Sequence, residues 1–197
     1  GTLFFAPFVQ DNPELSLILS FATVGVAFLF RPLGAIVCGH LGDRYGRKRV
    51  LAATLILMGV STALIGVLPT YAQIGLWAPV MLVGLRVLQG FSAGGEWGGA
   101  ALMAVEHAPT DRRSLFGAFP QIGVPLGMIV ATGALWCITT LVGAENFMAW
   151  GWRISFLLSI ALIIVGVFIR RAVEESPVFL RMQSRRSHSS APRGALL

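Results

Sequence analysis

Charged residues are scarce in this chain of 197 residues. Only 12% of the sequence is Asp, Glu, Lys or Arg, whereas 55% is hydrophobic, and a soluble domain carries about 25% charge. This deficit favours a membrane protein over an ordinary soluble domain. The net charge of +6 does not indicate a nucleic-acid partner, because the bases fall in short clusters between apolar runs and no recognised nucleic-acid motif accompanies them.

Other signatures are missing as well. The two cysteines, Cys38 and Cys137, lie in apolar runs without metal-ligand spacing, which predicts small buried core residues rather than a disulfide or a zinc site. No phosphate-binding loop with a Gly-Lys-Ser/Thr end is present, so an ATP-driven pump is not indicated. No Ser/His/Asp, Cys/His or metal constellation occurs either, and a membrane-bound enzyme is therefore a distant alternative. We expect neither a cofactor nor a metal.

Apolar runs long enough to cross about 30 Å of hydrocarbon occur five times, at residues 17–38, 50–68, 79–103, 115–142 and 152–169. They predict an all-α transmembrane fold with five membrane-spanning helices. An odd number of crossings places the two ends of the chain on opposite sides of the membrane.

The basic residues predict the orientation of these helices. They cluster after the first, third and fifth runs, whereas residues 1–16, 69–78 and 143–151 contain no Lys or Arg. The positive-inside rule makes the basic loops cytoplasmic and places the first residue outside. Since the chain opens at Gly1 without an initiator Met, a basic n-region or a signal peptide, we expect that a preceding helix is missing.

The apolar pattern stops near the C-terminal end. Residues 182–197 are rich in Ser, Arg and Pro and cannot bury a core, which predicts a disordered basic tail. Residues 1–181 are expected to form the helical bundle.

Three polar residues share one face of the third run. Steps of about 100° per residue place Arg86, Gln89 and Glu96 within roughly 80° of each other. A charge at the bilayer centre costs about 2.5–3.5 kcal/mol, so this stripe points to a substrate or ion route. Arg86 and Glu96 are separated by about 15 Å along the helix and cannot pair directly. Each needs a partner on another helix, in a water-filled cavity or in the substrate.

The polar residues in the runs leave alternatives open. Arg31 lies about 12 Å from the cytoplasmic end of its run; we expect it to face the bundle interior, where it offers a positive charge to an anionic substrate or forms a structural ion pair. Glu96 is either a proton carrier or a permanently neutral or paired acid that orders the helices. Gln89 and Gln121 either orient a substrate or bridge two helices.

Small residues and prolines mark possible contacts and bends. Close helix packing, or an open cavity, is expected at a glycine cluster formed by Gly90, Gly94, Gly95, Gly98 and Gly99. A bend or hinge is expected in the fourth run, at Pro120, Gly123, Pro125 and Gly127. Aromatic anchors at the outer interface are expected at Trp77, Trp150 and Trp152.

The segment 39–49, between the first two runs, carries three glycines, one acid and four bases. Glycine supplies the backbone freedom for a tight turn, and Asp43 can pair with an arginine. By itself, the segment could be a basic loop that only fixes the orientation.

This segment resembles the loop between helices two and three of the major facilitator superfamily, with its pattern of Gly, Asp, Arg and a following basic run. The resemblance implies that Asp43, Arg44 and Arg47 belong to a charge network that closes the cytoplasmic gate. Two further segments resemble the superfamily: the loop after helix four, with Glu106, Pro109, Arg112 and Arg113, and the acidic Ser-Pro segment after helix six, at residues 174–177. By the same resemblance, Glu106, Arg112 and Arg113 are expected to belong to the cytoplasmic gate.

The resemblance covers about residues 3–182 and assigns the five runs to helices two to six, a partial N-terminal half of a twelve-helix carrier. By this assignment, helix one and the C-terminal half of the carrier are absent from the sequence, and we expect them to be partners of this chain. The patterns at residues 30–34 and 86–99 are similar to the metabolite:proton symporter branch. In the superfamily, the arginine that corresponds to Arg86 is linked to proton coupling or substrate binding.

The resemblance implies a multi-pass protein of a bacterial cell membrane. It implies a secondary transporter that is driven by a proton gradient and moves a small polar metabolite by alternating access. A carboxylate such as shikimate is the first choice, because residues 95–99 and 151–153 are similar to shikimate-transporting members of the branch. The alternatives are a proline/betaine or dicarboxylate symporter, or a truncated membrane fragment that transports nothing.

Overall fold

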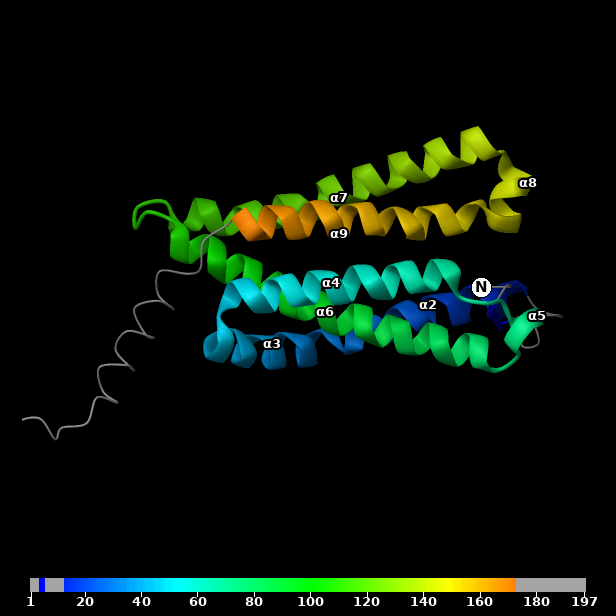
Figure 1. Cartoon of the computed structure of the whole chain (residues 1–197), viewed down its shortest axis with the longest axis horizontal. Coiled ribbons are helices and arrows are strands. Elements are labelled where there is room, and N and C mark those ends of the chain that lie inside the picture. The colour runs from blue at the N-terminus through cyan, green and yellow to red at the C-terminus, as the bar shows by residue number, and fades with distance from the viewer. Residues whose placement is uncertain (1–3, 6–12, 173–197) are drawn as a thin grey trace, which may run out of the picture.

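The computed structural model describes residues 4–5 and 13–172, and within these ranges every regular element is helical (Figure 1). This confirms the all-α prediction. The predicted tail at 182–197 and the acidic Ser-Pro segment at 174–177 lie outside the described residues.

Two helices in sequence make the first crossing. α2 (Pro13–Leu29) ends just before Phe30, and α3 (Arg31–Tyr45) begins just after it. Pro32 explains the interruption, because proline has no N–H to donate to the preceding turn. The two helices nevertheless form one continuous candidate span, Leu17–Tyr45.

A single residue separates α3 from α4 (Arg47–Val67). The prediction of a loop over residues 39–49 is wrong, since every residue of that segment except Gly46 is helical. Gly46 has φ 100° and ψ 138°, a left-handed φ that favours glycine, and its N–H donates to the carbonyl oxygen of Gly42 at 3.0 Å. The chain therefore reverses at one glycine, and the acid and bases of this segment project from helical positions.

The remaining elements complete an up-and-down bundle (Figure 1). They are α5 (Tyr71–Ile74), α6 (Trp77–His107), α7 (Arg113–Val142), α8 (Ala144–Asn146), the π-helix η1 (Phe147–Gly151) and α9 (Trp152–Ala172). Short turns at Gly75 and Gly143, both with positive φ, connect them on one side of the membrane.

The central element is α6, which packs against α2, α3, α4 and α7. Four segments of the described chain are long and apolar enough to cross a membrane: Leu17–Tyr45, Arg47–Val67, Arg113–Val142 and Phe147–Arg170. α6 is the longest helix, with 31 residues or roughly 45 Å, and it runs alongside α4 (Figure 1). It is not among those four segments, although its length is sufficient to cross a membrane.

Glycine permits backbone contact between α6 and the first crossing. A Cβ at Gly90 would lie 1.8 Å from the carbonyl oxygen of Ala27, and a Cβ at Gly94 would lie 1.9 Å from that of Arg31. No side chain fits at such distances, so these positions confirm the expected close packing. Gly98 is different, because a Cβ there would meet nothing within 4 Å.

Large apolar side chains cover much of the outer surface, including Leu141, Phe168 and Leu29 at 82%, 76% and 75% exposure. Such a surface suits acyl chains rather than water. α7 has no buried residue, and it runs without interruption through Pro120 and Pro125. Cys38 is buried as expected, but Cys137 on α7 is exposed, so its predicted burial is wrong.

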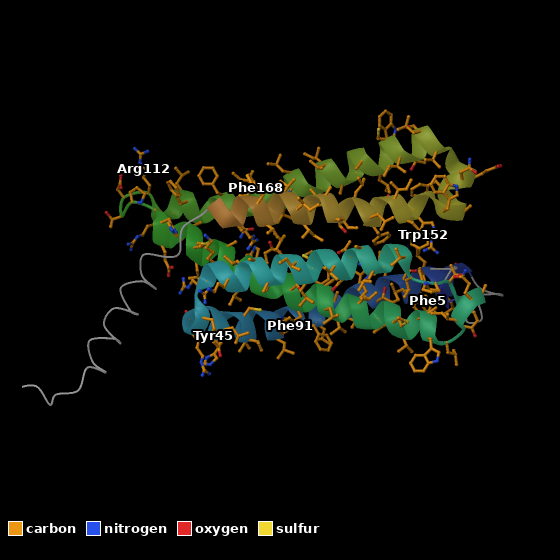
Figure 2. All side chains as sticks on the ribbon, viewed as in Figure 1. Phe5, Tyr45, Phe91, Arg112, Trp152 and Phe168 are labelled. Carbon is orange, nitrogen blue, oxygen red and sulfur yellow. The ribbon has the colours of Figure 1, made fainter. Side chains whose placement is uncertain are left out.

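The two ends of the bundle differ in character (Figure 2). One end holds Tyr45, beside the Gly46 turn, together with Arg112 and the end of α9; the other holds Phe5 and Trp152. All three basic clusters therefore meet at one end, as the orientation predicted from Lys and Arg requires.

The three tryptophans do not behave alike. Trp77 and Trp150 are exposed at 70% and 50%, as aromatic anchors would be. Trp152 instead packs edge-to-face against Phe4 and Phe156, beside the buried cluster at this end of the bundle. Its prediction as an interfacial anchor is therefore wrong.

Replacing Gly94 with Ala should lower the free energy of unfolding by about 1–3 kcal/mol, because the new methyl group would overlap the carbonyl oxygen of Arg31. Thermal unfolding of the complete gene product in detergent measures this. Gly84→Ala is the matched control on the same helix. A Cβ at Gly84 meets nothing within 4 Å, so this variant should be unchanged or more stable by up to about 1 kcal/mol. Equal losses in both variants would contradict the close contact.

Candidate functional site

A chain of hydrogen bonds connects Arg86 to α4. The Arg86 Nη1 donates to Gln89 Oε1 at 3.0 Å, and Gln89 Nε2 donates to Thr62 Oγ1 at 2.7 Å. The Thr62 hydroxyl in turn donates to the carbonyl oxygen of Met58 at 2.7 Å. Gln89 is buried and bridges two helices, which is one of the two roles that its sequence position allowed. This chain fixes the orientation of the Arg86 guanidinium.

A cavity of about 450 Å³ opens beside Arg86, and we call it the Arg86 cavity. Its polar lining consists of Arg86, Ser20 and Thr23. Its aromatic lining consists of Phe4, Phe5, Phe21, Trp152 and Phe156. None of the described lining residues is acidic.

Two N–H groups of this lining are unused. Arg86 Nε and Trp152 Nε1 are buried and have no hydrogen-bond partner among the described residues. Unsatisfied buried donors are costly, and the Arg86 guanidinium places a positive charge beside a cavity whose described lining has no acid. The Arg86 cavity is therefore suited to a group with negative charge or acceptor oxygens.

Glu96 lies toward the opposite end of the same helix and pairs with a different partner. Its Oε1 accepts a hydrogen bond from Nη2 of Arg170, near the end of α9. Both side chains are mostly buried, with exposures of 23% for Glu96 and 21% for Arg170. The structure thus provides the partner on another helix that the sequence required for Glu96, and the pair joins α6 to α9.

A second ionic cluster lies at the Gly46 turn. Arg47 at the start of α4 pairs with Glu106 near the end of α6, and its Nη2 lies 3.3 Å from Asp43 Oδ1 on α3. The side chains of Arg47 and Glu106 are only 16% and 14% exposed, whereas that of Asp43 is 64% exposed. This cluster joins the ends of three helices at the basic end of the bundle, where the gate residues were expected.

The other predicted gate residues stand apart from this cluster. Arg44 and Arg113 are exposed, and Arg44 lies 5.4 Å from the ring centroid of Tyr45. Arg112 is 68% exposed and lies 3.6 Å from its neighbour Asp111. Arg44 belongs to the last turn of α3 and Arg47 to the first turn of α4, so the Gly46 turn lies between them.

Two predicted pathway residues, Arg31 and Gln121, do not line the Arg86 cavity. Arg31 is exposed, and its guanidinium lies 3.9 Å from the ring centroid of Phe28 on α2. Its expected position in the interior of the bundle is wrong for the described part of the chain. Gln121 on α7 is also exposed, so it is not brought together with Arg86, Gln89 and Glu96.

The sequence alone did not predict the contacts of three residues: Thr62, Arg170 and Arg153. Thr62 supplies the hydroxyl between Gln89 and α4, and Arg170 was interpreted only as an orientation signal. Arg153 donates through Nη1 to the carbonyl oxygen of Gly66 at 2.9 Å and lies 4.8 Å from the Trp152 ring centroid. The segment 151–153 was noted as a motif, yet nothing in it indicates that the arginine binds a backbone carbonyl on α4.

Comparison with known proteins identifies the family of this chain. Residues 3–193 match the family described as "Sugar (and other) transporter". The chain belongs to this family. It is a multi-pass membrane protein of the major facilitator type, and the family is one of transporters, not of enzymes.

Several bacterial members of the Sugar (and other) transporter family are close in sequence. The inner membrane metabolite transport protein YhjE of Escherichia coli is 46% identical over 190 residues, covering 96% of this chain and 43% of that protein. The shikimate transporter of Escherichia coli is 48% identical over 176 residues, covering 89% and 40%. The proline/betaine transporter of Salmonella typhimurium is 44% identical over 179 residues, covering 91% and 35%.

Solved structures confirm the fold of the family. The proton:xylose symporter XylE bound to 6-bromo-6-deoxy-D-glucose superposes with a TM-score of 0.81 at 19% identity, covering 94% of this chain and 41% of that one. The inward-open conformation of XylE from Escherichia coli gives 0.74 at 20% identity, covering 93% and 43%. This chain therefore spans less than half the length of the proteins that it matches.

Removing the charge of Arg47 should destabilise the protein strongly. Arg47→Gln removes the guanidinium that pairs with the mostly buried Glu106 carboxylate, and we expect a loss of about 1.5–3 kcal/mol in the free energy of unfolding, measured by thermal unfolding in detergent. Arg112→Gln removes the same charge from an exposed pair and should change the stability by at most about 1 kcal/mol. Adding Glu106→Gln to Arg47→Gln should recover part of the loss. A purely additive double variant would show that the two side chains do not interact.

Proposed function

We propose that this chain forms part of a secondary transporter that moves a small carboxylate together with a proton. The observation that carries the proposal is the Arg86 cavity, a space of about 450 Å³ that is lined by a guanidinium and has no acidic lining residue among those described. A guanidinium binds a carboxylate through paired, charge-assisted hydrogen bonds. The 48% identity to the shikimate transporter supports a carboxylate as the cargo.

The aromatic lining of the same cavity favours a second candidate. Five aromatic rings surround the space beside Arg86, and aromatic faces attract quaternary ammonium groups. Betaine carries such a group together with a carboxylate, so one end of the molecule would meet Arg86 and the other the rings. The 44% identity to a proline/betaine transporter is consistent with this candidate.

Movement of the cargo would follow from alternating access. In carriers of this architecture, two halves rock around a site near the middle of the membrane. The ionic cluster of Asp43, Arg47 and Glu106 joins three helix ends, and it would hold the cytoplasmic side closed while the Arg86 cavity is open to the other side. Breaking the cluster would then accompany opening toward the cytoplasm.

The proton step is assigned to Glu96. A proton and Arg170 compete for the same carboxylate, because binding a proton removes the negative charge that holds the guanidinium. Protonation would release the end of α9 from α6, and loss of the proton would restore the pair. The ionic contact between Glu96 and Arg170 thus gives proton binding a defined structural consequence.

Uptake by the complete gene product tests the cargo. Vesicles with an imposed proton gradient should accumulate labelled shikimate, and Arg86→Gln should lower its uptake at a fixed low concentration by about 10-fold or more, as expected for loss of a charged hydrogen bond. Arg49→Gln, which removes an exposed base outside the cavity, should retain uptake. Labelled 2-oxoglutarate and betaine are assayed in parallel. Uptake of betaine alone would establish the second candidate, and uptake of none of the three would refute both.

Proton coupling is tested separately with Glu96→Gln. This variant cannot exchange a proton at residue 96, so cargo should still equilibrate down its own gradient but should no longer accumulate when a proton gradient is imposed. Glu145→Gln changes an exposed acid on α8 and should accumulate cargo as the unaltered protein does. Accumulation by Glu96→Gln at the normal level would remove Glu96 from the coupling mechanism and leave it as a structural partner of Arg170.

A further inference from the structure

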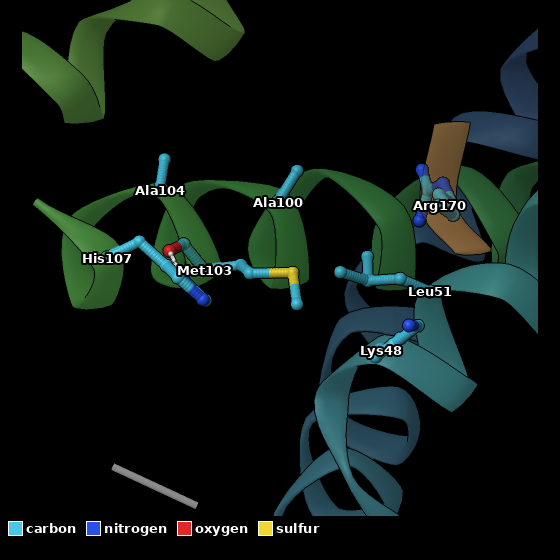
Figure 3. A pocket seen from close by; sticks show the side chains of 7 residues that line it. All are labelled: Lys48, Leu51, Ala100, Met103, Ala104, His107 and Arg170. Carbon is cyan, nitrogen blue, oxygen red and sulfur yellow. Dashed lines mark hydrogen bonds between the residues drawn. The ribbon is translucent and has the colours of Figure 1, made fainter. Parts of the chain in front are cut away.

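A second pocket lies far from the Arg86 cavity, between the start of α4, the last turns of α6 and the end of α9 (Figure 3). Its volume is about 280 Å³. The walls are apolar and consist of Leu51, Ala100, Met103 and Ala104. Figure 3 shows Leu51 and Met103 reaching toward each other from α4 and α6.

Three nitrogen-bearing side chains complete the lining: Lys48, His107 and Arg170. Each lies within the first or last two turns of its helix, at the basic end of the bundle. None of the residues that line the pocket in the described part of the chain is acidic. The pocket therefore combines an apolar wall with a basic rim.

The nearby carboxylates already have partners. Glu96 accepts from one terminal nitrogen of Arg170, which leaves that guanidinium with further N–H groups, and Glu106 pairs with Arg47. The His107 Nδ1 lies 2.9 Å from the carbonyl oxygen of Met103. A carbonyl only accepts, so Nδ1 donates, and this bond fixes the orientation of the ring at the rim.

The position of the pocket in the membrane identifies its occupant. The positive-inside rule places this end of the bundle at the cytoplasmic leaflet, which is the leaflet rich in anionic lipids. An anionic headgroup matches the basic rim, and the upper part of an acyl chain matches the apolar wall. A free phosphate ion would use the rim alone and leave the wall without a partner.

We propose that this pocket binds one anionic phospholipid of the cytoplasmic leaflet, with the headgroup phosphate at Lys48 and Arg170 and the acyl chain against Leu51 and Ala104. A lipid in this position contacts α4, α6 and α9 at once. It would stabilise the cytoplasmic ends of these helices against separation. The pocket shares no lining residue with the Arg86 cavity, but it does contain Arg170, the partner of Glu96 in the proposed proton step.

Native mass spectrometry of the complete gene product in detergent tests the proposal. Added dioleoylphosphatidylglycerol should be retained as one tightly bound molecule, whereas dioleoylphosphatidylcholine and soluble glycerol 3-phosphate should not be retained. Lys48→Gln should lower the affinity for dioleoylphosphatidylglycerol about fivefold, as expected for removal of one interfacial base. Arg49→Gln removes the same charge one residue further along, outside the pocket, and should lower it less than twofold.

A second variant distinguishes binding in this pocket from nonspecific electrostatic attraction of anionic lipid to the basic end of the bundle. Ala104→Phe fills the apolar wall without changing any charge, and it should also lower retention of dioleoylphosphatidylglycerol about fivefold or more. Thermal unfolding without added lipid shows whether Ala104→Phe is folded. If it is not, the retention measured for Lys48→Gln decides the test. Equal losses in Lys48→Gln and Arg49→Gln, equal retention of dioleoylphosphatidylcholine, or binding of glycerol 3-phosphate alone would each overturn the proposal.

Discussion

The fold depends on the close approach between α6 and the helices around it. Glycines at 90 and 94 bring the α6 backbone against carbonyl groups of the first crossing, and α4 and α7 cover other parts of the same helix. In hydrocarbon, no hydrophobic effect drives helices together, so packing and interhelical hydrogen bonds must do so. A helix as polar as α6 is stable in the membrane because its neighbours, and not lipid, surround its polar groups.

The central position of α6 also explains how two charges coexist on one helix. Arg86 is oriented by Gln89 and Thr62 at one end, and Glu96 pairs with Arg170 toward the other. The two groups are separated by about 15 Å, so neither neutralises the other. In the proposed mechanism each charge serves a different event: Arg86 would bind cargo at the Arg86 cavity, and Glu96 would exchange a proton at the contact that holds α9 to α6.

The cytoplasmic end is held together by ionic contacts rather than by a large apolar core. The buried apolar cluster that includes Phe4, Phe5 and Ile65 lies at the opposite end, whereas Arg47 joins α4 to α3 and α6 at the Gly46 turn. Ionic contacts of this kind can break and form again at modest cost when a competing partner is present. In the proposed mechanism this difference would let the basic end open while the other end stays packed, and the proposed lipid would act on the same basic end.

The sequence by itself predicted the helical class, the apolar runs and the family, because the length of an apolar run and a short glycine-acid-base motif are local properties. The orientation predicted from the distribution of Lys and Arg likewise rests on a local property. The sequence also placed Arg86, Gln89 and Glu96 on one face, since helical periodicity is local. Only the tertiary structure decided which helices meet that face. It paired Glu96 with Arg170 and Gln89 with Thr62, turned Arg31 and Gln121 outward, and replaced a loop by one glycine. These outcomes depend on contacts between residues far apart in the chain, and no local pattern specifies which side chain on another helix will lie within hydrogen-bonding distance.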